Sequence, residues 1–261
     1  MVLMNFGFAL KRKLCFAIGL MMAFVTMAQK KSTSENQVWA SYNNQTRLSN
    51  KIGLWGDFHL RTKENYFDDF STGIARLGLM YYLSDNTKLT AGYAYVHNYP
   101  QAGHTDIARP EHRPWQQVQW HNKFPNLRLM QYVRLEERFR RKIKDNDELA
   151  DGYNFNWRTR YNLLLNFALN KKPFAPKTIS YFVSDEVHIN FGNEIVYNSF
   201  DQNRLFVGLQ YHANSHDVLQ FGLMYLYQQL ASGNNYRHIY APRISYFHNL
   251  DLRKKDPLPK T

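Results

Sequence analysis

A two-residue alternation of apolar and polar side chains runs through residues 153–167, and it constrains the fold of this chain more than any other feature. Aromatic and aliphatic residues occupy one set of alternate positions, and asparagines together with Arg158 and Arg160 occupy the other. Successive side chains of a strand point to opposite faces, whereas a helix would scatter both classes around its circumference. The segment is therefore expected to be a β-strand with one apolar and one polar face.

The same pattern recurs along the chain with charged residues on the polar face. Apolar residues of 127–140 alternate with Arg134, Glu136 and Arg138, and those of 202–212 alternate with Arg204. Long strands with an aromatic-rich apolar face and a charged opposite face are what a closed barrel in lipid requires. The sequence therefore predicts an all-β chain, a single antiparallel transmembrane β-barrel with its charges enclosed.

Eleven segments have the length and pattern of barrel strands, and short turns alternate with longer loops between them. Single-chain bacterial barrels usually have an even number of strands. The sequence therefore leaves 10 and 12 strands open, and Glu194–Asn198 is the candidate for a further strand. The eleven segments are residues 37–48, 52–62, 72–83, 87–97, 114–123, 127–140, 153–168, 178–188, 202–212, 217–228 and 237–248.

Residues 1–28 are expected to be a secretory signal peptide, because Lys11–Lys13 precede the apolar run Leu14–Met27. At 1.5 Å per residue this run spans about 21 Å, which is short of a bilayer core of about 30 Å. Export would also remove Cys15, the one cysteine of the chain, and with it any disulfide or thiolate metal site. The expected layout continues with a polar leader at 29–36, the barrel at 37–248 and a polar C-terminal tail at 249–261.

The formal net charge of the chain is +12, which suggests an anionic partner. Nucleic acid is the weakest candidate, because export takes the chain out of the cytoplasm and the arginines stand singly at alternate strand positions. Outer-membrane lipid with anionic head groups and a small anionic solute or ligand fit better.

Short motifs are spread over most of the chain. They are Trp39, RLGLMYYLS at 76–84, AGYAY at 91–95, EHRPWQQ at 111–117, RLEERF at 134–139, RTRY at 158–161 and FDQNRLFVGLQY at 200–211. Taken together, from about Gln37 to Phe247, they resemble the family catalogued as domain of unknown function 2490, which consists of bacterial outer-membrane barrels. The resemblance implies a location in the outer membrane and contributes no catalytic residues.

Charged residues on the enclosed face are the candidates for a lumen or binding site. Paired arginines and carboxylates would brace a barrel too narrow to conduct. An excess of arginine would instead favour an anion-selective lumen or a site for an acidic ligand. Both interpretations stay open, and the residues concerned are Arg134, Glu136, Arg138, Arg158, Arg160 and Arg204.

An outer-membrane lipid hydrolase is the main alternative from another class. Ser184 and His188 share a strand face and Ser245 and His248 do not, no Gly-x-Ser-x-Gly motif is present, and no oxyanion hole is evident. We therefore expect no catalytic residues.

The loop His97–His112 carries histidines and acids, but their spacing matches no metal motif. We therefore expect no metal site and no cofactor. Glu111, Arg113 and Trp115 are expected to fasten this loop to the barrel rim.

The five tryptophans, Trp39, Trp55, Trp115, Trp120 and Trp157, are expected to form two interfacial girdles on the outer face. A secreted soluble barrel that binds a small ligand is the second alternative, and it would invert the faces of the same strands. The sequence favours an outer-membrane barrel with a structural, passive-transport or surface-binding role.

Overall fold

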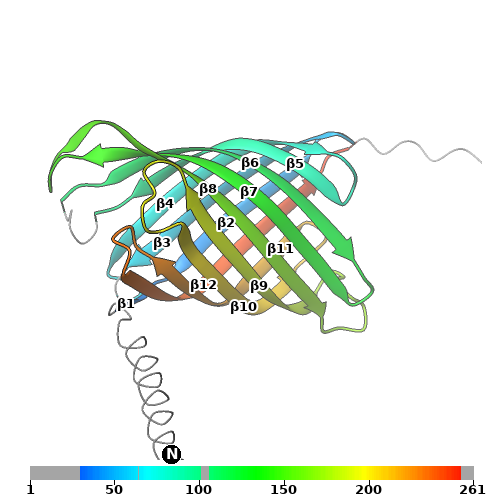
Figure 1. Ribbon diagram of the computed structural model, residues 1–261. Coiled ribbons are helices and arrows are strands. Elements are labelled where there is room, and N and C mark those ends of the chain that lie inside the picture. The colour runs from blue at the N-terminus through cyan, green and yellow to red at the C-terminus, as the bar shows by residue number, and fades with distance from the viewer. Residues whose placement is uncertain (1–29, 64, 101–105, 254–261) are drawn as a thin grey trace, which may run out of the picture.

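The alternating segments fold into one sheet that closes on itself as a barrel (Figure 1). The computed structural model describes residues 30–63, 65–100 and 106–253, so the expected signal peptide lies outside the described residues. No helix within those ranges is long and apolar enough to cross a bilayer. The strands are β1 (Lys31–Asn36), β2 (Trp39–Arg47), β3 (Ile52–Lys63), β4 (Asp69–Tyr82), β5 (Thr87–Asn98), β6 (Arg109–Lys123), β7 (Leu127–Ile143), β8 (Leu149–Ala168), β9 (Thr178–Phe191), β10 (Phe200–His212), β11 (Asp217–Gln229) and β12 (Asn235–Asp251).

The barrel closes through a parallel pair of strands. From β2 to β12 each strand pairs antiparallel with the next one in the chain, and β12 then pairs with β2. These strands number eleven, so the first and last run in the same direction and their pairing is parallel. The predicted all-β barrel is confirmed: all eleven predicted segments belong to the ring, and β1 is a twelfth strand of the same sheet. An odd ring departs from the usual even count of bacterial barrels.

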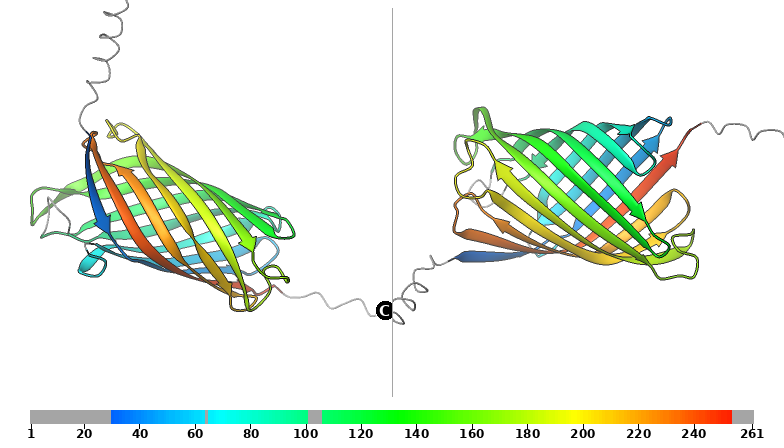
Figure 2. Two further views of the ribbon diagram at one scale, coloured as in Figure 1. Left: turned by 90° about the horizontal axis from the view of Figure 1, so that it is seen from below. Right: turned by 45° about the vertical axis from the view of Figure 1, so that its right-hand side comes forward.

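Strand β1 continues the line of β2 along the same edge of β12 (Figure 2). Asn36 is opposite Tyr240 and Trp39 is opposite Arg243, so the register does not change across the break at Gln37 and Val38. Residues 31–36, which were expected to belong to a polar leader, thus form a twelfth strand. This strand extends the line of β2 and adds no further strand to the closed ring.

Each of the eleven predicted segments overlaps one of the strands β2 to β12. The proposed strand at Glu194–Asn198 was wrong, because residues 192–199 form the connection between β9 and β10. The backbone turns at Gly192, and the Ile195 N–H donates to the Gly192 carbonyl at 3.0 Å, which ends strand pairing there.

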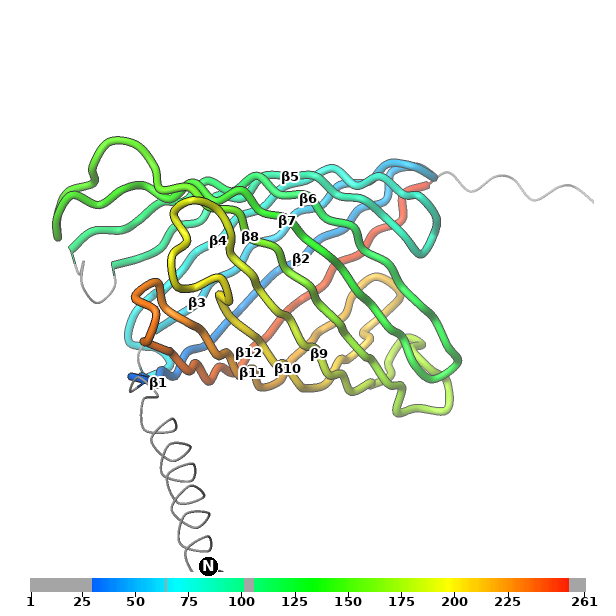
Figure 3. Tube along the Cα trace, viewed as in Figure 1, coloured from blue at the N-terminus to red at the C-terminus, as the bar shows by residue number. Residues whose placement is uncertain are grey.

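The connections at residues 48–51, 83–86, 124–126, 169–177 and 213–216 lie at one end of the barrel, here called the short-turn end. The others lie at the opposite, long-loop end, where the β7–β8 hairpin extends (Figure 3). Since β2 and β12 run in parallel, β2 begins at the long-loop end and β12 finishes at the short-turn end.

Apolar side chains face outward and polar side chains face the barrel interior, as the alternation predicts. On β8, Asn156, Arg158, Arg160 and Asn162 are buried, whereas the outward Tyr161 is exposed. The expectation that all five tryptophans form outer girdles was wrong. Trp39 and Trp115 are buried inside the barrel, and Trp55 packs edge-on against Trp115 with ring centroids 5.7 Å apart. These three tryptophans occupy inward positions in the alternation of β2, β3 and β6. The prediction assigned all tryptophans to the outer face by residue type and did not count these positions.

Two cross-strand pairs of glycines allow neighbouring backbones to approach closely. Gly208 lies opposite Gly222, and Gly78 lies opposite Gly92 beneath the Trp115 ring. A Cβ atom at Gly222 would be 2.0 Å from the Val207 carbonyl oxygen, a contact that requires the backbone to move. These positions therefore require glycine for steric reasons.

Replacing Gly222 with alanine is expected to lower the free energy of unfolding by about 1–3 kcal/mol, because the added methyl group overpacks the sheet. Gly56→Ala is the matched control, since its Cβ would meet no atom closer than Leu77 Cδ2 at 3.8 Å. Chemical denaturation of the folded barrel measures both. Equal stability of the two variants would contradict the steric account.

Candidate functional site

All six residues predicted for the enclosed face lie inside the barrel. Arg134, Glu136 and Arg138 project from β7, Arg158 and Arg160 from β8, and Arg204 from β10. Five of the six are buried, and Arg138 is partly buried. Their strands are positioned by antiparallel register, in which Glu136 lies directly opposite Arg158.

Glu136 is the acceptor at the centre of this group. Its Oε2 lies 2.6 Å from Arg158 Nη2, and its Oε1 lies 2.6 Å from Arg160 Nη2. Arg113 Nη1, from β6, is 3.7 Å from the same Oε1. One buried carboxylate thus links guanidinium groups from β6 and β8, and the charge-assisted bonds compensate for the loss of hydration.

Sequence reasoning did not place Glu111 in this network, although its position is an inward one of β6. Its Oε1 is 2.7 Å from Arg138 Nε and 2.8 Å from Arg113 Nη2. Glu111 and Arg113 therefore belong to a barrel strand, and the prediction that they fasten a loop to the rim was wrong. Strand β6 begins at Arg109, earlier than the predicted start at residue 114. The alternation of inward and outward side chains continues through Pro110 and Pro114, which were expected in or next to a loop.

Two further carboxylates extend the network to β9 and β10. Asp201 Oδ2 lies 2.9 Å from Arg158 Nη1. Glu186 Oε2 lies 3.1 Å from Arg204 Nη1, and Tyr132 donates its hydroxyl hydrogen to Glu186. Glu186 lies within the predicted segment 178–188, where period-two counting would have found it, and Asp201 directly precedes the predicted segment 202–212.

A separate ion-pair group lies on the β3–β4 wall. Asp57 accepts from Arg76 Nε at 2.7 Å and from the Trp55 indole N–H at 2.5 Å. His59 Nε2 is 3.0 Å from Asp57 Oδ1. This group braces the two neighbouring strands β3 and β4 through ion pairs with Asp57.

Several interior arginines have no carboxylate partner among the described residues. Arg61 stacks on Trp39, with Cζ 3.7 Å from the ring centroid, and Arg243 lies over Phe206 at 4.8 Å. Arg134 bonds to Gln117 at 2.8 Å and lies over Trp115 at 4.4 Å. The barrel interior thus carries more guanidinium charge than its carboxylates neutralise.

Two cavities occupy the lumen. One, of about 170 Å³, lies toward the long-loop end and is lined by seven arginines, including Arg113, Arg138 and Arg237, with no carboxylate. The other, of about 390 Å³, lies toward the short-turn end and is lined by seven arginines, Asp57 and Glu186. Both are lined by Trp39, Arg61, Arg160 and Arg204, which together form the waist of the lumen.

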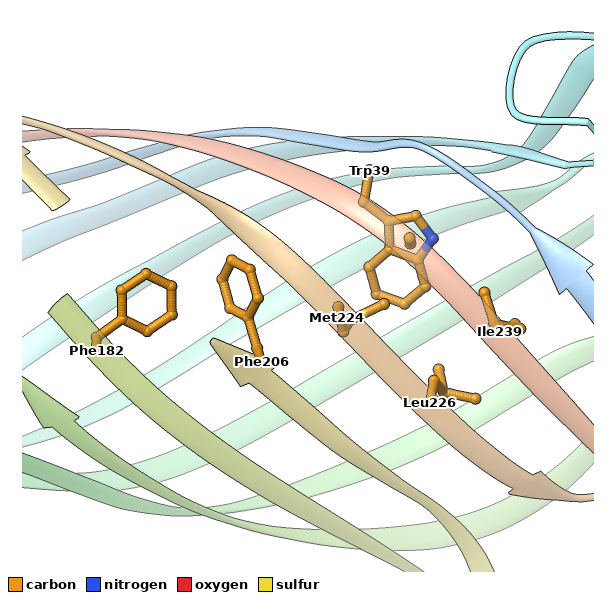
Figure 4. Packing of buried hydrophobic residues seen from close by; sticks show 7 residues of the cluster. Trp39, Phe182, Phe206, Met224, Leu226 and Ile239 are labelled. Atoms are coloured by element: carbon orange, nitrogen blue, oxygen red, sulfur yellow. The ribbon is translucent and has the colours of Figure 1, made fainter. Parts of the chain in front are cut away.

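An apolar cluster covers the interior wall formed by β9 to β12 and β2 (Figure 4). Phe182 and Phe206 meet edge to face with centroids 4.7 Å apart. The cluster consists of Trp39, Phe182, Phe206, Met224, Leu226, Ile239 and Ala241. This wall therefore presents apolar side chains to the lumen beside the charged Glu186, Arg204 and Arg243 of the same strands.

The serine and histidine pairs weighed for hydrolysis do not meet. Ser184 and His188 both point inward from β9, but four residues of strand separate them by about 13 Å. Ser184 Oγ accepts from Asn162 at 2.9 Å, while His188 contacts Glu186 and Gln202. Ser245 Oγ accepts from Ser41 Oγ at 2.8 Å, and His248 contacts Asp217.

The loop residues considered for a metal do not converge. Glu111 faces inward and His112 faces outward on β6, and His104 lies outside the described residues. Among the residues that the structure describes, no group of three or more histidines, cysteines or acids is arranged to hold a metal ion.

The fold and its interior define a β-barrel protein with a charged lumen. The family model described as "Protein of unknown function (DUF2490)" matches residues 36–237, and the chain belongs to this family. The resemblance inferred from the motifs is thereby confirmed. A search of curated proteins gives no match. Among solved structures, a "NanC porin" is 11% identical, covers 74% of this chain and 87% of its own, and gives a TM-score of 0.43.

Removing the charge of Glu136 is expected to cost about 3–5 kcal/mol of folding stability, because Arg158 and Arg160 would lose their shared acceptor in a buried site. The test is Glu136→Gln in chemical denaturation. The matched control is Glu137→Gln on the outward face, expected to change stability by less than about 0.5 kcal/mol. Similar losses for both variants would contradict the role assigned to Glu136.

Proposed function

We propose that the protein is an outer-membrane β-barrel whose arginine-lined interior admits small anions. The observation that carries the location is the apolar outer face, on which Leu77, Leu79 and Leu223 are 73%, 64% and 65% exposed. Soluble monomers rarely expose a continuous apolar surface that encircles the molecule. Exposure of this apolar surface is favourable when hydrocarbon surrounds the barrel and the polar residues are enclosed.

Aromatic residues near both ends of the outer face support the same location. Tyr227 and Tyr236 stack near the long-loop end, with ring centroids 5.3 Å apart. Phe167 and Tyr181 stack near the short-turn end at 4.7 Å. Such rings suit the two interfaces between hydrocarbon and water. These tyrosine and phenylalanine rings occupy the positions of the expected girdles, in which Trp39 and Trp115 take no part because they are buried inside the barrel.

The excess of arginine supports an anionic solute. The cavity at the long-loop end has seven arginines and no carboxylate in its lining. Positive charge in a confined, low-dielectric space attracts anions and repels cations. The ion pairs around Glu136 brace the wall, and Arg113, Arg158 and Arg160 belong both to these pairs and to the lining of the long-loop cavity. The structural and the passive-transport interpretations therefore share residues of one lumen.

In planar bilayers the protein is expected to give small currents with anion preference, because the waist of Trp39, Arg61, Arg160 and Arg204 narrows the path. Reversal potentials in a potassium chloride gradient measure the preference. Arg237→Glu, in the lining of the long-loop cavity, should reduce it, whereas Arg140→Gln, which lines neither cavity, should not. Silence or cation preference would contradict anion passage.

Leu223→Arg is expected to cost about 2–4 kcal/mol of unfolding free energy in lipid vesicles, because the new charge would enter hydrocarbon. Leu169→Arg is the matched control, since Leu169 is 57% exposed in the β8–β9 connection, where an arginine reaches water. If Leu223→Arg is as stable as the control, a soluble barrel is favoured over a membrane barrel.

A further inference from the structure

The two cavities of the lumen differ in chemistry. The cavity at the long-loop end is lined mainly by polar and charged side chains, with Trp39, Ile74, Val96, Leu226 and Ile239 as its apolar and aromatic members. The cavity at the short-turn end combines arginines with an apolar surface formed by Met130, Leu164, Phe206, Val218 and Phe247. Its volume of about 390 Å³ lies within the range of roughly 300–1,000 Å³ that small-molecule sites occupy.

The cavity at the short-turn end, here called the short-turn cavity, is bounded at the waist of the lumen by a cluster of arginines. Trp39 has Arg61 over its ring at 3.7 Å and Arg204 at 5.1 Å. Arg76, Arg160, Arg204 and Arg243 line the same cavity as Arg61. The aromatic ring keeps two guanidinium groups near each other, and it does not neutralise them.

Two of these arginines lack a counter-charge at bonding distance. Among the described residues, Arg61 and Arg243 form no ion pair, and neither side chain donates a hydrogen bond to a protein acceptor. Their guanidinium groups both line the cavity. An enclosed charge without a partner is costly, and an anion in the cavity would relieve that cost.

The apolar surface of the short-turn cavity directly adjoins the cluster of arginines. Phe206 lies under Arg243 at 4.8 Å and belongs to the cluster with Phe182 and Met224 (Figure 4). Leu164, from β8, packs against the same cluster. A molecule with a charged group at the waist would therefore place its next few atoms against apolar side chains.

We propose that the short-turn cavity binds an amphiphilic carboxylate, with its carboxylate between Arg61 and Arg243 and its apolar or aromatic part against Phe206 and Leu164. The proposal rests on the proposed anion-admitting lumen and names the class of solute. A guanidinium fork matches a carboxylate with two parallel hydrogen bonds. Phosphate would satisfy the charge but leave the apolar half of the site in contact with water.

The test is calorimetric titration of the full barrel in uncharged detergent with phenylacetate, its neutral isostere phenylacetamide, and inorganic phosphate. Phenylacetate should bind at least roughly tenfold more tightly than either of the others, because phenylacetamide lacks the negative charge and phosphate lacks the apolar ring. Equal binding of phenylacetamide or of phosphate would overturn the proposal.

Arg243→Gln should weaken phenylacetate binding roughly tenfold or more, because it removes one charge-assisted contact. Because Arg243 forms no ion pair among the described residues, this variant should retain the fold and unfold in chemical denaturation as the parent does. Arg140→Gln removes the same charge inside the barrel but outside both cavities, and it should bind as the parent does. Equal affinities of the two variants would overturn the assignment.

The outcomes separate this site from the proposed function. Tight phenylacetate binding by a protein that is silent in bilayers would support the site and contradict anion passage. An anion-preferring current from a protein that binds phenylacetate no better than phenylacetamide would support the lumen and overturn the carboxylate site.

Discussion

Sharing of enclosed carboxylates between guanidinium groups from different strands is the interaction on which the interior depends. Each of the five buried carboxylates in the described chain, Asp57, Glu111, Glu136, Glu186 and Asp201, pairs with at least one arginine. Such pairs are stable only while the geometry is held, and removal of one partner leaves a buried charge. The network therefore demands fixed strand register, which the antiparallel ladders supply.

Closure on eleven strands gives the barrel its second constraint. The parallel β2–β12 pair places the start of β2 and the finish of β12 at opposite ends of the barrel. Trp39 opens β2 at this seam, so the residue around which Arg61 and Arg204 gather belongs to the closing strand. The waist of the lumen and the closure of the sheet thus depend on the same few residues.

Period-two counting predicted most of the fold and the inward direction of all six charged candidates. It identified Arg134, Glu136 and Arg204 because strand parity is a local property of the sequence. The partners Glu186, Glu111 and Asp57 lie on other strands, and cross-strand register is set by the whole sheet. The same reason explains Trp115, whose inward position follows from the parity of β6 and the space above Gly78 and Gly92. The strand β1 has too few apolar residues to show a pattern.

Quenching of tryptophan fluorescence by brominated lipid chains tests the central claim, that the apolar flank faces hydrocarbon and the charged flank is enclosed. Trp157 points outward beside Phe191, and Trp115 is buried inside the barrel. In vesicles, a variant with Trp157 as its one tryptophan should be strongly quenched, and a variant with Trp115 alone should not. Stronger quenching of Trp115, or no quenching of Trp157, would contradict the account.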